Sequence, residues 1–135
     1  YDFTQVELFK AGHHGSKTSS NDCLLKEIKP KICVATCCAG SVEYTKNIAN
    51  TFPTQAFIDR IAPYTSKVYV PIGIEMVEKS SGKYENAGEY YALNGNIVVI
   101  SQQSGVTVEC SNNNTVLKDT DWFRKYRQTP TAWLN

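Results

Sequence analysis

The alternation of strand-like and helix-like segments constrains the fold of this chain more than any other feature. The alternating residues 3–10 predict a strand, and the apolar, β-branched residues 31–37 predict a buried one. Between them, the polar residues 20–22 predict the start of a helix that Pro30 ends. Strands and helices in this order favour a layered α/β architecture.

The rest of the chain continues this order. Thr54 can cap a second helix, which Pro63 stops, and residues 67–70 predict another strand. Residues 96–110 hold two β-branched runs on either side of a polar turn and predict a hairpin. Residues 122–126 predict a short amphipathic helix. We expect the strands to form mostly one sheet.

Residues 72–94 give the least regular pattern. Residues 80–82, Ser-Ser-Gly, mark a turn. Tyr84, Tyr90 and Tyr91 suggest partly covered loops or short strands rather than long ones. The architecture is therefore least constrained in this segment.

Composition excludes several classes of protein. The 135 residues suit one domain, and a net charge of +1 gives no general case for nucleic acid or an anionic membrane as partner. No apolar run approaches the roughly 18 residues of a membrane-spanning helix. The five cysteines are odd in number and form no C-x-x-C pair, so we expect mainly packing roles for them. The adjacent Cys37 and Cys38 leave a metal or redox pair open.

The pentapeptide Gly12-His13-His14-Gly15-Ser16 follows the first predicted strand and holds the only histidines of the chain. Glycines permit a sharp turn and close approach of a ligand. Histidines offer metal ligation or proton transfer. A catalytic metal normally needs three or more protein ligands. The others are therefore carboxylates and cysteines of this chain, or they lie outside it; a hydrogen-bonded surface turn is the alternative.

The residues around this block resemble the metallo-β-lactamase superfamily, and within it the competence-type hydrolases of DNA-uptake channels and the phosphorylcholine esterases. The family has a strand, a Leu-Lys-Val-Gly-His-His-Gly-Ser-Lys-Thr-Ser block, a helix and a Lys-Pro-Lys strand. Here residues 8–19 are Leu-Phe-Lys-Ala-Gly-His-His-Gly-Ser-Lys-Thr-Ser, and residues 24–31 end in Lys-Pro-Lys. The similarity is close over about residues 5–37, looser through the second helix, and returns at the predicted hairpin.

For the fold, the resemblance implies an α/β domain, the four-layer αβ/βα metallo-β-lactamase sandwich. Residues 1–135 would be its C-terminal half. Half a sandwich exposes an apolar sheet face, so we expect either the N-terminal half of the same fold or self-association to cover it. The relatives are bacterial and occur in extracytoplasmic or cytoplasmic settings.

For the site, the resemblance implies that His14 binds one of two metal ions, zinc or manganese. His13 would face the substrate phosphate or orient a ligand, as a catalytic residue. Ser16, Lys17 and Thr18 would line the rim and bind the substrate. The implied reaction is hydrolysis of a phosphodiester or related ester, with nucleic acid as one such substrate.

Two departures from the family leave alternatives open. The family's upstream His-x-Asp-x-Asp-His motif and bridging aspartate are not in this chain, and Phe52 stands where many relatives have a histidine. The chain is then either the C-terminal portion of a metal-dependent hydrolase, inactive as 135 isolated residues, or an inactive fragment or degenerate copy that serves as a binding or structural module. The sequence that precedes Tyr1 in the gene would discriminate between them.

Overall fold

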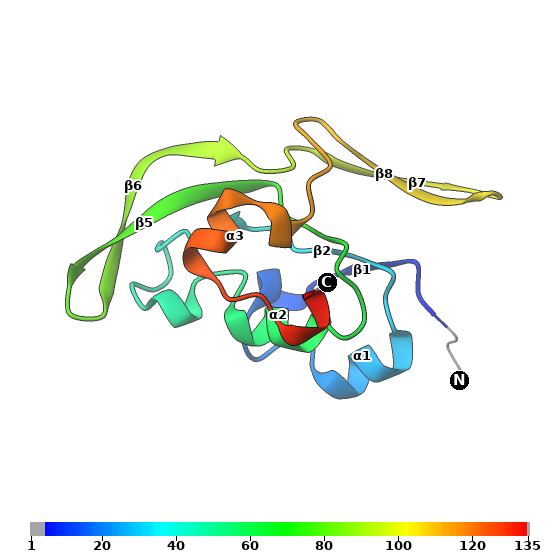
Figure 1. Ribbon diagram of the computed structural model, residues 1–135, viewed down its shortest axis with the longest axis horizontal. Coiled ribbons are helices and arrows are strands. Elements are labelled where there is room, and N and C mark those ends of the chain that lie inside the picture. Colours follow the sequence, from blue (N-terminus) through cyan, green and yellow to red (C-terminus); the bar gives the residue numbers. More distant parts are fainter. Residues whose placement is uncertain (1–4, 135) are drawn as a thin grey trace.

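The computed structural model describes residues 5–134, in which short helices gather against a layer of strands (Figure 1). The α-helices of this part are α1 (Asp22–Ile28), α2 (Gln55–Ile61) and α3 (Asp121–Tyr126). Short 3-10 turns are η1 (Gly12–Gly15), η2 (Ile48–Asn50), η3 (Leu117–Asp119) and η4 (Thr131–Trp133). The strands are β1 (Leu8–Lys10), β2 (Ile32–Val34), β3 (Cys38–Ala39), β4 (Val68–Tyr69), β5 (Ile72–Ser80), β6 (Lys83–Ala92), β7 (Ile97–Gln102) and β8 (Gly105–Cys110). The mixed α/β class expected from the sequence is confirmed.

The helices begin where side chains supply the missing hydrogen bonds. Asn21 accepts a bond of 3.0 Å from the Leu24 amide at the start of α1. Thr54 accepts one of 3.1 Å from the Phe57 amide at the start of α2. Such caps satisfy amides that have no partner within the helix. The predicted starts of both helices are therefore confirmed.

The strands of residues 5–134 form three sheets, so the expectation of mostly one sheet is wrong. Their orders are β1-β2-β4, β3-β5-β6 and β7-β8. The first two run along the same chain segments, because β2 leads into β3 and β4 leads into β5. Cys33 lies opposite Val68, and Cys38 lies opposite Ile72. The segment from β2 to β3 therefore has one residue more than the segment from β4 to β5 that pairs with it. An extra residue of this kind interrupts a ladder.

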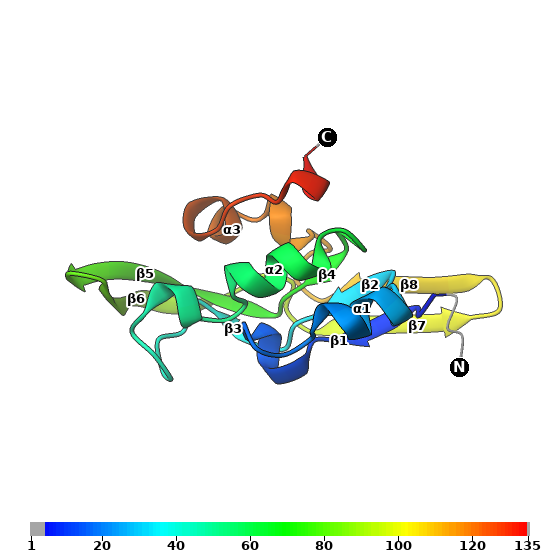
Figure 2. The ribbon, with the colours of Figure 1, turned by 90° about the horizontal axis from the view of Figure 1, so that it is seen from below.

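Residues 72–94 differ most from expectation. They form the two longest strands of the described residues, β5 and β6, rather than loops or short strands. The predicted turn is correct: Ser80 lies opposite Lys83, and Gly82 has a φ of +73°. Both hairpins, β5–β6 and β7–β8, reach outward in opposite directions from the helices (Figure 2). The last four residues of β5 are exposed, so no buried face imposes a pattern there.

The hydrophobic core lies between the helices and the parallel strands. Phe57, Ile58 and Ile61 of α2 are fully buried, as are Cys33 of β2 and Val68 of β4. The first predicted strand covers residues 3–10, of which residues 3 and 4 lie outside the described part of the chain. Within residues 5–10 the strand is β1, which is shorter than expected.

Aromatic residues hold the C-terminal segment against this core. Trp122, Phe123 and Trp133 are all buried. The Trp133 indole donates a hydrogen bond of 3.0 Å to the Thr65 carbonyl oxygen. The segment after α3 is thereby held near α2 and the strand that follows it.

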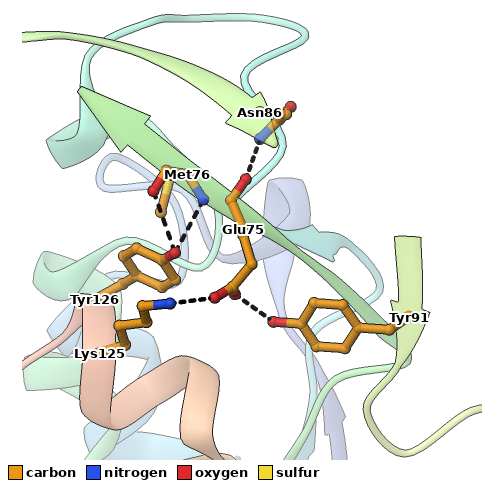
Figure 3. Close-up of polar contacts among 6 residues, drawn as sticks. All are labelled: Glu75, Met76, Asn86, Tyr91, Lys125 and Tyr126. Carbon is orange, nitrogen blue, oxygen red and sulfur yellow. Dashed lines mark hydrogen bonds and ion pairs between the residues drawn. The ribbon is translucent and has the colours of Figure 1, made fainter. Parts of the chain in front are cut away.

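Polar contacts dock α3 on the β5–β6 hairpin (Figure 3). The Glu75 carboxylate accepts hydrogen bonds from Lys125 (2.5 Å) and from the Tyr91 hydroxyl (2.9 Å). The Tyr126 hydroxyl bonds the backbone of Met76, accepting from its amide at 3.0 Å and donating to its carbonyl at 3.2 Å. Burial by itself would raise the pKa of Glu75, but the bonds from Lys125 and Tyr91 outweigh it and lower that pKa.

Candidate functional site

The histidine loop, residues Gly12–Ser20, leaves β1 through a left-handed turn. His13 has φ 43° and ψ 49°, His14 has φ 57° and ψ 23°, and Gly15 has φ 81°. Left-handed backbone is uncommon for residues other than glycine and costs on the order of 1 kcal/mol each, so it marks sites where the surroundings impose it. Both imidazoles are exposed. The pair therefore lies on a solvent-facing loop at the end of the first strand, as expected.

A backbone carbonyl fixes the His14 ring. The Nδ1 atom of His14 lies 2.5 Å from the carbonyl oxygen of Thr36, which follows β2. A carbonyl oxygen only accepts, so Nδ1 is the donor and carries the hydrogen. In the neutral ring the lone pair is then on Nε2. Metal-ligating histidines are commonly oriented by this kind of bond from their other nitrogen.

Phe52 packs against both imidazoles. Its ring centroid is 5.3 Å from that of His13, in an edge-to-face arrangement, and 5.8 Å from that of His14. Tyr44 extends the aromatic group, with its centroid 6.4 Å from that of Phe52. Phe52 is thus in direct contact with both imidazoles of the candidate site. An apolar ring there supplies contact area but no proton.

A cavity of about 190 Å³ opens beside His14. Cys37, Cys38 and Glu43 line it, together with the aromatic rings of Tyr44 and Phe52. Burial raises the pKa of Cys37 to about 12 and that of Cys38 to about 11. Both therefore remain thiols near neutral pH, whereas metal ligation and nucleophilic attack use the thiolate. All five cysteines are free, and Cys33 is buried whereas Cys23 is exposed.

The predicted substrate-binding residues divide into two kinds. Lys17 and Thr18 are exposed at the rim of the loop. Ser16 is buried, and its hydroxyl shares a hydrogen bond of 2.7 Å with the hydroxyl of Ser19. Ser19 in turn donates to the Gly12 carbonyl oxygen at 2.6 Å. The two serines thus brace the loop, whereas the side chains of Lys17 and Thr18 face solvent.

Arg60 of α2 also braces this loop and was missed by the sequence analysis. Its Nη2 donates to the carbonyl oxygens of Ser16 (3.2 Å) and Ser19 (2.7 Å), and its Nε donates to that of Ser20 (3.2 Å). Nothing in the local sequence pairs a helix arginine with carbonyls 40 or more positions away. The role of the Thr36 carbonyl was missed for the same reason, since residue type does not reveal a backbone contact.

Within residues 5–134, no three histidine, cysteine, aspartate or glutamate side chains gather closely enough to hold a metal ion. The donor chemistry of His14 fits one metal ligand, and this arrangement does not by itself complete a site. None of the helices in the described part is long and apolar enough to cross a bilayer.

Comparison of the chain with protein-family models, with curated proteins and with solved structures gave no match. The functional interpretation depends on the residues of the histidine loop and on their geometry.

Proposed function

We propose that the chain is the C-terminal portion of a metal-dependent hydrolase of the metallo-β-lactamase superfamily that acts on a phosphodiester or related ester. The observation that carries the proposal is the bond from His14 Nδ1 to the Thr36 carbonyl, which leaves Nε2 of an exposed imidazole free. The same loop presents His13 and Lys17 at the surface. An imidazole, a second imidazole and a cation at one strand end suit hydrolysis of a phosphoester.

The metal in this proposal is zinc, as one or two ions, or manganese. His14 would hold it through Nε2, and imidazole nitrogen is a usual ligand of such ions. A metal bound there would supply a hydroxide at neutral pH and charge stabilisation of a phosphoryl oxygen. The remaining ligands would come from the N-terminal half of a four-layer αβ/βα sandwich.

The other residues of the loop would bind and orient the substrate. Lys17 is an exposed cation next to the turn, and Thr18 is an exposed hydroxyl beside it. Both groups donate hydrogen bonds that phosphate oxygens accept. His13 lies at the surface with its ring edge on Phe52, where it could orient a ligand or transfer a proton.

In this proposal, a companion layer covers one face of the strands. Leu8 of β1 is 41% exposed, Ile72 of β5 is 38% exposed and Val98 of β7 is 52% exposed. Each belongs to a different one of the three sheets. Apolar residues exposed singly are common on protein surfaces, so these three permit a covering layer but do not require one. The companion would be the N-terminal half of the sandwich or a second copy of the chain.

The contact of Phe52 with both imidazoles favours a second candidate function. A phenyl ring in the place of a histidine removes one proton-transferring group from the site. The protein would then be a degenerate copy of the hydrolase that keeps the loop and binds ligands without turnover.

Hydrolysis of bis-p-nitrophenyl phosphate in excess zinc or manganese tests the proposal. We expect no turnover by the 135 residues alone. We expect turnover by a longer form of the protein that carries the upstream His-x-Asp-x-Asp-His motif. There, His14→Ala should lower kcat roughly 10²-fold or more, because the activated hydroxide is lost. Lys17→Ala should act mainly on KM, because a rim cation binds ground state and transition state alike.

Three results would contradict these assignments. Robust turnover by the 135 residues would show that the site is complete without a companion half. An unchanged rate in the His14→Ala variant of the longer form would remove the metal-ligand assignment. A longer form that binds the phosphodiester without cleaving it would favour the degenerate copy.

A further inference from the structure

Arg127, the residue that follows α3, is a cation that has no carboxylate partner among residues 5–134. None of the ion pairs among residues 5–134 includes it. Its guanidinium lies 4.8 Å from the centroid of the Trp122 ring, which is itself buried. Burial lowers the pKa of Arg127 to about 10, so the group stays charged at neutral pH. A largely buried charge is costly unless it has dedicated hydrogen-bond partners.

The partners of Arg127 lie on both sides of Phe52. Its Nε donates to the Pro53 carbonyl oxygen at 3.0 Å. Its Nη2 donates to the carbonyl oxygen of Thr51 at 3.0 Å and to the Thr51 hydroxyl at 2.9 Å. The remaining bond, from Nη1, goes to the Tyr126 carbonyl oxygen at 2.9 Å. The planar fork of an arginine thus holds the peptide groups that flank Phe52 in one orientation.

We infer that Arg127 is a positioning residue of the candidate site, which holds the Phe52 ring against His13 and His14 through the carbonyl oxygens of Thr51 and Pro53. The phenyl ring of Phe52 packs against both imidazoles. Within the described part of the chain, the hydrogen bonds of Arg127 go to Thr51, Pro53 and Tyr126, and none goes to a histidine. It therefore acts through the backbone of the segment that carries the ring.

The placement of the Phe52 ring also affects the cavity beside His14. Phe52 lines that cavity together with His14 and packs against both imidazoles, so its placement shapes the space beside the His14 ring. The value of this placement for catalysis rests on the proposed function. The placement itself does not, because it concerns only residues of this chain.

Arg60 provides a matched control. It is also an arginine whose guanidinium binds backbone carbonyls, but those carbonyls belong to Ser16, Ser19 and Ser20 in the histidine loop. It makes no such bond to the segment around Phe52. Its replacement disturbs a comparable set of bonds without touching the route through Thr51 and Pro53.

The test is a double-mutant cycle read by NMR. The chain has two histidines, so their carbon-bound ring protons give few signals, and those signals are sensitive to the ring current of a nearby phenyl group. Phe52→Leu removes that ring current. We expect Arg127→Lys to shift both histidine signals in the same direction as Phe52→Leu, because a lysine cannot hold three acceptors in one plane. In the Phe52→Leu background, we expect Arg127→Lys to shift them no further.

Thr51→Val provides a milder variant should Arg127→Lys fail to fold. It removes one acceptor of Arg127, and we expect a smaller shift in the same direction. Arg60→Lys should give a shift of similar size with and without Phe52. Thermal unfolding of each variant checks that it is folded.

The inference would be overturned if folded Arg127→Lys and Thr51→Val both left the histidine signals unchanged. It would also be overturned if Arg127→Lys shifted them equally in both backgrounds, since that pattern indicates a general structural effect. Neither metal nor substrate enters the measurement. The inference can therefore fail while the proposed function stands, and it can hold in a protein without hydrolytic activity.

Discussion

The histidine loop and the β5–β6 hairpin use polar side chains in opposite ways. In the loop, serine hydroxyls and Arg60 are bonded to one another or to backbone carbonyls, and the imidazoles and Lys17 remain open to solvent. In the hairpin, two carboxylates are bonded to lysines of other segments: Glu75 pairs with Lys125, and Glu85 pairs with Lys46.

This difference separates a candidate site from a structural contact. Polar groups that satisfy each other stabilise the docking of a helix or loop and leave little for a ligand to bind. Polar groups that remain open on a backbone held in an unusual conformation are available for chemistry. The histidine loop presents polar groups that remain open, whereas the polar groups in Figure 3 are bonded to one another.

A matched pair of glycine substitutions should give the largest difference in stability between the histidine loop and the hairpin. Gly15 and Gly82 have similar φ values, +81° and +73°. An added Cβ at Gly15 would lie 3.1 Å from the Pro53 Cβ and 3.2 Å from a ring carbon of Phe57, whereas one at Gly82 meets nothing within 4 Å. We expect Gly82→Ala to lower the free energy of unfolding by about 1 kcal/mol through backbone strain alone. Gly15→Ala should lower it by roughly 2–3 kcal/mol, because crowding of the core is added.

Chemical denaturation of both variants measures this difference. Equal losses would show that the histidine loop is no more tightly packed than an exposed hairpin turn. The packing around the histidine loop would then not distinguish it from the hairpin.

A smaller effect concerns the Glu75 contact in the hairpin. The pKa of Glu75 is lowered in the folded state, so its carboxylate stabilises the fold above the ordinary value of 4.5. That contribution is lost as pH falls through the lowered pKa. We expect Glu75→Gln to be less stable than the natural protein near neutral pH, and the gap to close under acid. Thermal unfolding from neutral to acidic pH measures the gap, and a gap independent of pH would contradict the assignment.

The sequence predicted local structure better than sheet organisation. The caps at Asn21 and Thr54 and the hairpin at residues 96–110 could be predicted because neighbouring residues encode them. The division of the strands into separate sheets could not be predicted. It depends on one extra residue between Cys33 and Cys38, compared with the segment from Val68 to Ile72 that pairs with them. The long strands β5 and β6 were not predicted, because the outer part of β5 is exposed. Without a buried face, the sequence there shows no alternation of apolar and polar residues.

The same limit applies to the candidate site. His13, His14, Lys17 and Thr18 could be chosen as candidates because side chains of these types bind metal ions or phosphate groups. The structure places all of them on the surface of one loop. The supporting contacts could not be picked out, because they run from distant residues to backbone carbonyls. The bond from His14 to the Thr36 carbonyl is the main example.

The protonation of the His14 ring tests the central claim most directly. Long-range ¹H–¹⁵N correlation at mildly alkaline pH reports which ring nitrogen carries the hydrogen, and a His14→Ala variant assigns the signals. We expect His14 to carry the hydrogen on Nδ1, bonded to the Thr36 carbonyl oxygen, with Nε2 free to bind a metal. A hydrogen on Nε2, or rapid exchange between the two nitrogens, would contradict the claim that the fold prepares His14 as a ligand.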